Sequence, residues 1–287
     1  MRPSAASLLL DLGNSRLKWQ LCSGEGGVLG QGALLSAHRS ATEVVAELAQ
    51  ACMPGLTALD EQGLPCRAAL VSVGPAEQAE ALLQWAERAT TRPVCHVRAC
   101  AAQAGLRNDY CDPSQLGSDR WVAALGAIEA PAAHAPTALP VPQAQQLLVV
   151  SAGTATVMDS VSRLPEGGWR FEGGVILPGF DLMRRALAQG TAALGPLFEA
   201  APQALSDGGW PRDSAQALAL GIDLAQTSPV LGLPAVQCMV VHGGHAQAWL
   251  DAHHRLGAGL QQPMPAAVHT PELIFLGLRR ALAHDQG

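Results

Sequence analysis

Residues 8–18 have the sequence LLLDLGNSRLK, and this stretch decides the fold assignment. A short apolar run ends at Asp11, a turn containing Gly13 follows, and the residues beyond the turn alternate between apolar and polar as far as Leu21. An apolar run, a glycine turn and period-two alternation are typical of two strands joined by a tight turn. We therefore expect a β-hairpin whose first strand is buried.

A second copy of this pattern begins about half a chain length later. Residues 147–158 have the sequence LLVVSAGTATVM, again an apolar run, a turn with glycine and a second apolar run. Alignment of the two stretches matches Asp11 with Ser151 and Gly13 with Gly153. A supersecondary unit that is repeated once per half of the chain predicts a duplicated architecture of two lobes.

The sequence around these hairpins alternates between helical and strand patterns. Apolar residues at helical spacing predict helices over residues 41–52, 76–90 and 117–129. Short apolar runs predict strands over residues 68–73 and 237–241, and residues 273–283 are expected to form a strand or a helix.

Prolines mark the boundary between the two halves. Residues 131–142 contain four prolines among Ala and Thr, which is typical of a linker or a loop insertion. We expect an N-terminal lobe over residues 1–130, a Pro/Ala-rich linker over 131–145 and a C-terminal lobe over 146–287.

Composition excludes several classes of protein. Of the 287 residues 48% are hydrophobic, enough for a packed core, and the formal charge of −6 argues against a nucleic-acid-binding surface. The seven cysteines are scattered without a Cys-x-x-Cys pair, which favours a reduced cytoplasmic protein. No run approaches the roughly 20 apolar residues of a membrane helix, and the N-terminal apolar run is too short for a secretion signal. We expect a cytoplasmic protein that binds neither nucleic acid nor membrane.

Both hairpins have the chemistry of a phosphate site. Backbone N–H groups exposed at a glycine turn can bind phosphate oxygens, and a hydroxyl such as that of Ser15 or Thr154 adds a donor. The carboxylate of Asp11 requires a cation between itself and phosphate, which indicates a hydrated Mg²⁺. Lys18 is suited to a β- or γ-phosphate. Two such hairpins facing each other would hold a nucleotide from both sides, whereas the alternative is that each is merely a hairpin with Gly at its turn.

The sequence GSDR at residues 117–120 opens a predicted helix and has two interpretations. Asp119 is either an N-terminal cap, since carboxylates accept hydrogen bonds from the first N–H groups of a helix, or a general base that orients a substrate hydroxyl. Arg120 could bind an anionic group on the substrate.

Two other motifs carry less chemistry. The glycine-rich residues 172–179 fit neither a dinucleotide-binding nor a P-loop pattern. The spacing of His242, His245, His253 and His254 matches no zinc motif. Gly243 and Gly244 are better interpreted as a turn near a flat ligand such as adenine.

Taken in order, these motifs resemble those of the type III pantothenate kinases. The matching segments are residues 11–18, Tyr110, residues 117–120, residues 153–156 and residues 173–179, and the resemblance covers essentially the whole chain. It implies an α/β fold of the acetate and sugar kinase/Hsp70/actin class: a duplicated ribonuclease-H-like, actin-like ATPase architecture with mixed five-stranded sheets flanked by helices. It also implies ATP-dependent phosphorylation of pantothenate to 4′-phosphopantothenate, the first step of coenzyme A biosynthesis, by a homodimer that binds pantothenate near the subunit interface.

The resemblance assigns roles to individual residues. Asp119 would be the catalytic proton acceptor, and Asp11 would bind Mg²⁺ through water. The residues implied to bind ATP are Asp11, Leu12, Gly13, Asn14, Ser15, Arg16, Leu17, Lys18 and Thr154. The residues implied to bind pantothenate are Tyr110, Gly117, Ser118, Asp119, Arg120 and Thr191, the last reaching in from the partner subunit. Residues 173–179 would shape that interface.

One position departs from the family pattern. The second phosphate motif usually begins with an Asp that helps to bind a monovalent cation, K⁺ or NH₄⁺, and this chain has Ser151 there. A neutral hydroxyl is a poorer ligand for K⁺ than a carboxylate, although backbone carbonyls can still hold an ion. The sequence therefore leaves the need for a monovalent cation open.

Two other functions compete with this one. The first is a kinase of the same fold that acts on a sugar or another small hydroxylated acid, and the short chain leaves little room for the added subdomains of sugar kinases. The second is a regulatory or accessory ATP-binding protein without a small-molecule acceptor, against which the intact Asp119 speaks. Dependence of ATP turnover on pantothenate distinguishes these functions.

Overall fold

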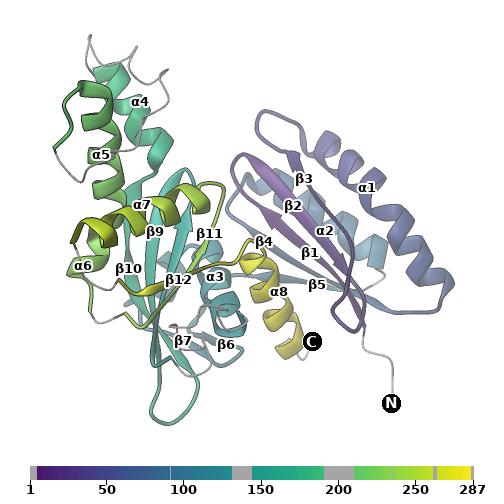
Figure 1. The fold of residues 1–287 in the computed structure, drawn as a ribbon. Helices are drawn as coiled ribbons and strands as arrows, with labels where there is room; N and C mark the ends of the chain where they lie inside the picture. Colours follow the sequence, from purple (N-terminus) through teal and green to yellow (C-terminus); the bar gives the residue numbers. More distant parts are fainter. Residues whose placement is uncertain are drawn as a thin grey trace. The chain divides into compact units, whose positions relative to one another are not determined.

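The computed structural model describes residues 5–90, 92–130, 144–190, 210–234, 236–260 and 264–285. The chain divides into two compact units, one formed by Met1–Glu129 with Glu272–Gly287 and the other by Ala130–Pro271 (Figure 1). The proline-rich residues 131–142 and Thr191 lie outside the described residues. A search of the described residues finds no helix with the length and apolar character needed to cross a membrane.

The first unit is built on a mixed five-stranded sheet with the order β3-β2-β1-β4-β5. Its strands are β1 (Ala6–Leu12), β2 (Arg16–Cys22), β3 (Val28–Leu35), β4 (Cys66–Ser72) and β5 (Val94–Val97). The central strand β1 pairs antiparallel with β2 and parallel with β4, and it is almost completely buried. A strand buried on both faces needs a nearly continuous apolar sequence, which the leucines of β1 supply.

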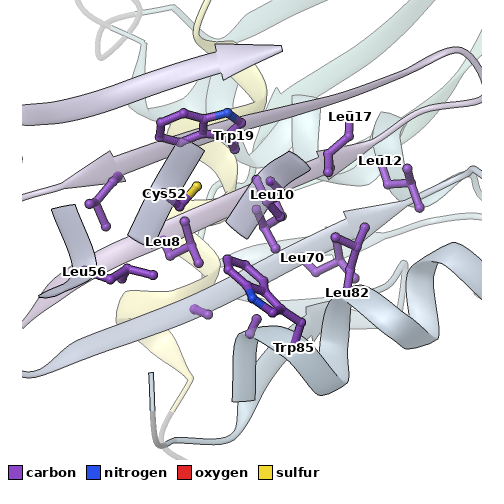
Figure 2. Close-up of a cluster of buried hydrophobic side chains, with 14 of the residues drawn as sticks. Leu8, Leu10, Leu12, Leu17, Trp19, Cys52, Leu56, Leu70, Leu82 and Trp85 are labelled. Carbon is purple, nitrogen blue, oxygen red and sulfur yellow. The ribbon is translucent and has the colours of Figure 1, made fainter. Parts of the chain in front are cut away.

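Helices α1 (Ala41–Glu61) and α2 (Ala76–Thr90) supply residues to the core on one face of this sheet. Figure 2 shows Leu8 and Leu10 of β1 lying among Trp19 of β2, Leu56 of α1 and Trp85 of α2. Helix α1 runs nine residues beyond its expected end because Leu56 and its neighbours continue the buried face past Pro54. Tertiary packing thus overrides the local signal of a proline, which by itself favours a helix end.

The other helices of the first unit are α3 (Ser118–Glu129) and α8 (Leu273–His284). The two helices pack so closely that a Cβ atom on Gly126 would lie 2.0 Å from the Leu273 carbonyl oxygen. Helix α8 also contacts β1 and β4, where Arg67 donates a hydrogen bond to the Leu282 carbonyl at 2.8 Å. Residues 272–285, expected as part of the C-terminal lobe, therefore pack with the first unit, because the apolar face of α8 is buried there.

Two short strands complete the first unit before α3. Strands β6 (Ala102–Gln103) and β7 (Leu106–Asn108) form a hairpin, and a 3₁₀ turn, η1 (Pro113–Gln115), leads into α3. Arg280 of α8 donates a hydrogen bond to the Ala104 carbonyl at the hairpin turn, at 2.8 Å.

The second unit repeats the strand order of the first. The second sheet has seven strands where five were expected, and the five that belong to this unit run in the order β10-β9-β8-β11-β12, with β8 antiparallel to β9 and parallel to β11. The strands are β8 (Gln146–Ala152), β9 (Ala155–Arg163), β10 (Trp169–Pro178), β11 (Cys238–His242) and β12 (Ala266–His269). Its helices are α4 (Phe180–Gly190), α5 (Ser214–Thr227), α6 (Pro229–Gly232) and α7 (Ala246–Leu260). The predicted duplication of an actin-like lobe is confirmed.

Candidate active site

The first hairpin has an acidic and a basic side chain next to each other. Asp11 at the end of β1 lies opposite Lys18 of β2, so the two side chains lie on the same face of the sheet. The turn closes where Gly13 N–H donates to the Arg16 carbonyl at 2.9 Å, and the turn residues 14–16 are exposed. This arrangement leaves an exposed turn next to a half-buried carboxylate.

Residues at the end of β4 form hydrogen bonds to the first hairpin. The N–H groups of Val73 and Gly74 both donate to the Leu12 carbonyl, at 3.0 and 3.2 Å. A Cβ atom on Gly74 would lie 2.8 Å from the Gly13 carbonyl oxygen, so only glycine permits this approach. The sequence pattern predicts only the strand over residues 68–73 and gives no sign that Gly74 supports the turn.

Burial dominates the electrostatics of Asp11. It raises the pKa of this carboxyl from 3.8 to about 6; the positive charge of Lys18 lowers it, and the negative charge of Asp119 raises it further. The carboxylates of Asp11 and Asp119 are therefore close enough to repel each other. Within the described part of the chain these two carboxylates have no third metal-binding side chain beside them. Two carboxylates suit Mg²⁺, which keeps several waters and binds one or two protein carboxylates together with phosphate oxygens.

Asp119 lies in the first turn of α3. Its Oδ1 accepts a hydrogen bond from the backbone N–H of Arg120 at 2.9 Å, while Trp121 N–H donates to the Gly117 carbonyl at 3.1 Å. A Cβ atom on residue 117 would lie 2.7 Å from that same Oδ1, so Gly117 makes room for the carboxylate. Asp119 therefore lies inside the helix, one residue beyond Ser118, and not at the capping position that precedes a helix. Its half-buried carboxylate accepts from the N–H of the next residue, Arg120, and lies near Asp11.

Tyr110 and Arg120 meet next to Asp119. The Arg120 guanidinium carbon lies 5.7 Å from the centre of the Tyr110 ring, a cation–π contact, and Arg120 is only 9% exposed. The loop that carries Tyr110 is shaped by Asn108, whose side-chain oxygen accepts from Tyr110 N–H at 3.0 Å. Trp121 of α3 donates to the Gln103 side chain at 3.0 Å and ties the β6–β7 hairpin to the same helix.

The second hairpin, in the second unit, has the same topology with different chemistry. Its turn has one residue fewer, because Ala152 pairs with Thr156 whereas Leu12 pairs with Leu17. Gly153 N–H donates to the Ala155 carbonyl at 2.9 Å, and Thr154 is exposed at the tip. Opposite Ser151 lies Val157, so neither the acid nor the base of the first hairpin is repeated.

Two glycines bring neighbouring loops against this second turn. Gly179 N–H donates to the Thr154 carbonyl at 3.0 Å, and a Cβ atom on Gly179 would lie 2.3 Å from the Gly153 carbonyl oxygen. Gly243 has a φ of 105°, and its Cβ would lie 2.3 Å from the Ala152 carbonyl oxygen. A Cβ on Gly244 would meet no atom within 4 Å, so of the two glycines considered for a flat ligand it is Gly244 that borders open space.

Comparison with known proteins identifies the family. The family model described as type III pantothenate kinase matches residues 7–234. The chain belongs to the type III pantothenate kinase family. A type III pantothenate kinase of Cupriavidus taiwanensis is 36% identical over 79% of this chain and 80% of its own length. One from Halorhodospira halophila is 33% identical over 97% of this chain and 98% of its own.

The family membership sets the reaction. The chain is an ATP-dependent kinase that phosphorylates pantothenate in coenzyme A biosynthesis. Among solved structures, a ROK family glucokinase from Streptomyces griseus in complex with glucose and AMPPNP matches with a TM-score of 0.54 over 99% of this chain and 100% of the other. At 13% identity that likeness concerns the fold alone.

As a type III pantothenate kinase the chain gathers several predicted site residues in its first unit. Asp11, Lys18 and Asp119 interact there, and Tyr110 contacts Arg120. Leu12 and Leu17 have completely buried side chains in the core, so they can meet a ligand only through backbone atoms. Ser151 and Thr154 belong to the second unit, and Thr191 lies outside the described residues.

Proposed function

We propose that the exposed turns of both hairpins bind the phosphates of ATP and that Asp119 is the general base for pantothenate. The hydroxyl oxygen of pantothenate bonds to the γ-phosphorus while the bond from that phosphorus to the β,γ-bridging oxygen breaks. The hydroxyl proton passes to the Asp119 carboxylate, and ADP leaves with the electron pair of the broken bond. The observation that carries the proposal is the interaction of Asp11, Lys18 and Asp119 at the end of β1.

Asp11 has a separate role in this proposal. Its carboxylate, with its water shell, would hold Mg²⁺, which when bound neutralises charge on the β- and γ-phosphate oxygens. Lys18 and the N–H groups of residues 14 and 15 would bind the same phosphates, with the Ser15 and Thr154 hydroxyls as further donors. Catalysis would then consist mainly of positioning and electrostatic stabilisation.

Arg120 would bind the carboxylate of pantothenate. A planar guanidinium suits a carboxylate because it can donate two parallel hydrogen bonds, and the Tyr110 ring beside it fixes the plane of the guanidinium. The backbone of Gly117 and the hydroxyl of Ser118 border the same helix start and would contact the rest of the substrate. Thr191 of the partner subunit would complete the site in a cytoplasmic homodimer, and sedimentation of only monomer at micromolar concentration would contradict that assembly.

The test is ADP release by an Asp119→Asn variant with and without pantothenate. We expect turnover to fall by at least about 100-fold, as loss of a general base typically causes, with little change in the affinity for ATP. Asp60→Asn is the matched control, because Asp60 is an exposed carboxylate on α1 outside the proposed site. Turnover near that of the wild type in Asp119→Asn would refute the role of the base. Wild-type ATP turnover that ignores pantothenate would favour a regulatory ATP-binding protein.

A further inference from the structure

Ser151 and His242 form a side-chain hydrogen bond at the end of β8. The Ser151 hydroxyl oxygen and His242 Nε2 lie 2.6 Å apart, and the two residues are register partners in the parallel pair β8–β11. His242 is 9% exposed, so most of the imidazole is removed from solvent. The bond ties together the two strand ends that lead into the turn at Gly153 and the loop at Gly243.

The same two positions differ in the first unit. Ser151 corresponds to Asp11 in the duplicated topology, and His242 corresponds to Val71, the partner of Asp11 on β4. Thus the second unit has exchanged a carboxylate beside an apolar neighbour for a hydroxyl beside an imidazole. Ser151 in place of an acid removes negative charge, and His242 in place of a valine adds a hydrogen-bonding nitrogen. Both differences make the position a poorer cation site.

Three backbone carbonyls around this turn already accept hydrogen bonds. The Ala152 carbonyl accepts from His245 N–H at 3.0 Å, the Thr154 carbonyl from Gly179 N–H at 3.0 Å, and the Ala155 carbonyl from Gly153 N–H at 2.9 Å. Within the part of the chain that the structure describes, no group of three or more His, Cys, Asp or Glu side chains could hold a metal ion. A hard monovalent cation needs several oxygen ligands, so these residues do not fit the cation site that the family pattern implies.

We propose that the Ser151–His242 hydrogen bond takes the structural place of a monovalent cation at the second hairpin, so that this chain transfers phosphate without K⁺ or NH₄⁺. His242 is then a positioning residue: it fixes the ends of β8 and β11 and, through them, the two loops that approach the Thr154 turn. This inference rests on the proposed function, since it assigns the second hairpin to phosphate binding.

The first test measures pantothenate-dependent ADP release at constant ionic strength in K⁺, NH₄⁺, Na⁺ and tetramethylammonium salts, with ATP supplied free of K⁺ and Na⁺. We expect kcat and KM for ATP to agree within about twofold across the four cations, because the described residues around the second turn include no acidic cluster to hold an ion. Saturable activation by K⁺ or NH₄⁺ of about tenfold or more would overturn the proposal.

A binding measurement separates this proposal from the proposed function. If no cation supports pantothenate-dependent turnover, the proposed function fails. Calorimetric titration of the protein with MgADP in K⁺ and in tetramethylammonium then still tests whether nucleotide binding depends on the monovalent cation. Equal affinities in the two salts would support the role of the Ser151–His242 pair, whereas markedly tighter MgADP binding in K⁺ would overturn it.

Substitutions of His242 provide the second test. His242→Ala should raise KM for ATP several-fold and leave kcat within about twofold, as expected for a lost hydrogen bond that positions a binding loop. His242→Gln keeps a side-chain amide able to bond the Ser151 hydroxyl and should restore the wild-type KM. The matched control is His269→Ala, which removes an exposed imidazole from the end of the neighbouring strand β12. An unchanged KM in His242→Ala would overturn the positioning role, and should that variant fail to fold, the glutamine variant and the cation series remain decisive.

Discussion

Ionised Asp11 should lower the free energy of unfolding of the ligand-free protein, because its carboxylate is desolvated and lies near the carboxylate of Asp119. Its pKa is about 6 in the folded state and 3.8 in the reference state. At a pH between these values the folded protein holds a proton that the unfolded chain has lost, so the contribution of Asp11 to stability is greatest below pH 3.8 and is lost as the pH rises towards 6. At pH 7 the charged carboxylate therefore opposes folding.

The size of this effect follows from the pKa difference. At about 1.4 kcal/mol per pKa unit, the shift corresponds to roughly 3 kcal/mol at pH 7. Partial solvent exposure reduces that figure, so we expect Asp11→Asn to raise the free energy of unfolding by about 1–3 kcal/mol at pH 7. For a chain of this size such a gain corresponds to an increase in Tm of roughly 2–10 °C.

Thermal unfolding of the ligand-free protein at pH 7 and at pH 4 measures the effect. Asp11→Asn should exceed the wild-type Tm at pH 7 and lose most of that advantage at pH 4, where the wild-type carboxyl is largely protonated in the fold. In the same variant the Mg²⁺-dependent turnover should fall by roughly 100-fold, because the carboxylate proposed to hold Mg²⁺ is absent. Asp60→Asn is the control in both assays. A Tm at pH 7 that is equal to or below the wild-type value would refute the electrostatic argument.

Two further predictions concern the pantothenate side of the site. Gly117→Ala would place a Cβ 2.7 Å from the Asp119 carboxylate and displace it by several tenths of an ångström, so kcat should fall roughly tenfold or more, whereas Gly221→Ala, on an exposed helical position with open space, should not change kcat. An unchanged kcat in Gly117→Ala would show that the carboxylate position is not critical. Cys111 is an exposed thiol beside Tyr110, whereas burial raises the pKa of the other six cysteines. A thiol reagent should therefore label Cys111 first, and bound pantothenate should slow that labelling. Peptide mapping measures the labelling rate at Cys111. Equal rates with and without pantothenate would count against Tyr110 as a substrate contact.

Local sequence patterns predicted the strands and helices well where the signals agreed with packing. Helix α2 has the predicted bounds, residues 76–90, because Pro75 precedes it and its apolar face is regular. Helix α1 extends past its predicted end because buried leucines beyond Pro54 continue the core. For α8 the apolar run alone could not decide between strand and helix, and its close packing on α3 requires the glycines of a helix pair.

Most of the site contacts that the sequence did not reveal join residues far apart in the chain. Gly74 supports a turn at Gly13 through a backbone approach that no local motif announces. The bond between Ser151 and His242 joins residues 91 positions apart. Asn108, by contrast, lies only two residues from Tyr110, in a segment without a recognisable motif. The resemblance to the family singled out Ser151 as a departure, but only the pairing of β8 with β11 shows that His242 is its hydrogen-bond partner.

The two hairpins of the duplicated fold carry different side chains at corresponding positions. The first concentrates charge, with Asp11 opposite Lys18 and Asp119 nearby, and is sensitive to pH and to substitutions that change charge. The second has a hydroxyl and an imidazole at the corresponding strand ends, and its turn is shaped by the close approach of backbone carbonyls to Gly179 and Gly243. Under the proposed function the first hairpin would hold the cation and the reacting phosphate, and the second would hold a phosphate through backbone N–H groups and the Thr154 hydroxyl. Because uncharged hydrogen bonds are screened little by salt, the second hairpin should keep its shape across ionic conditions that alter the first.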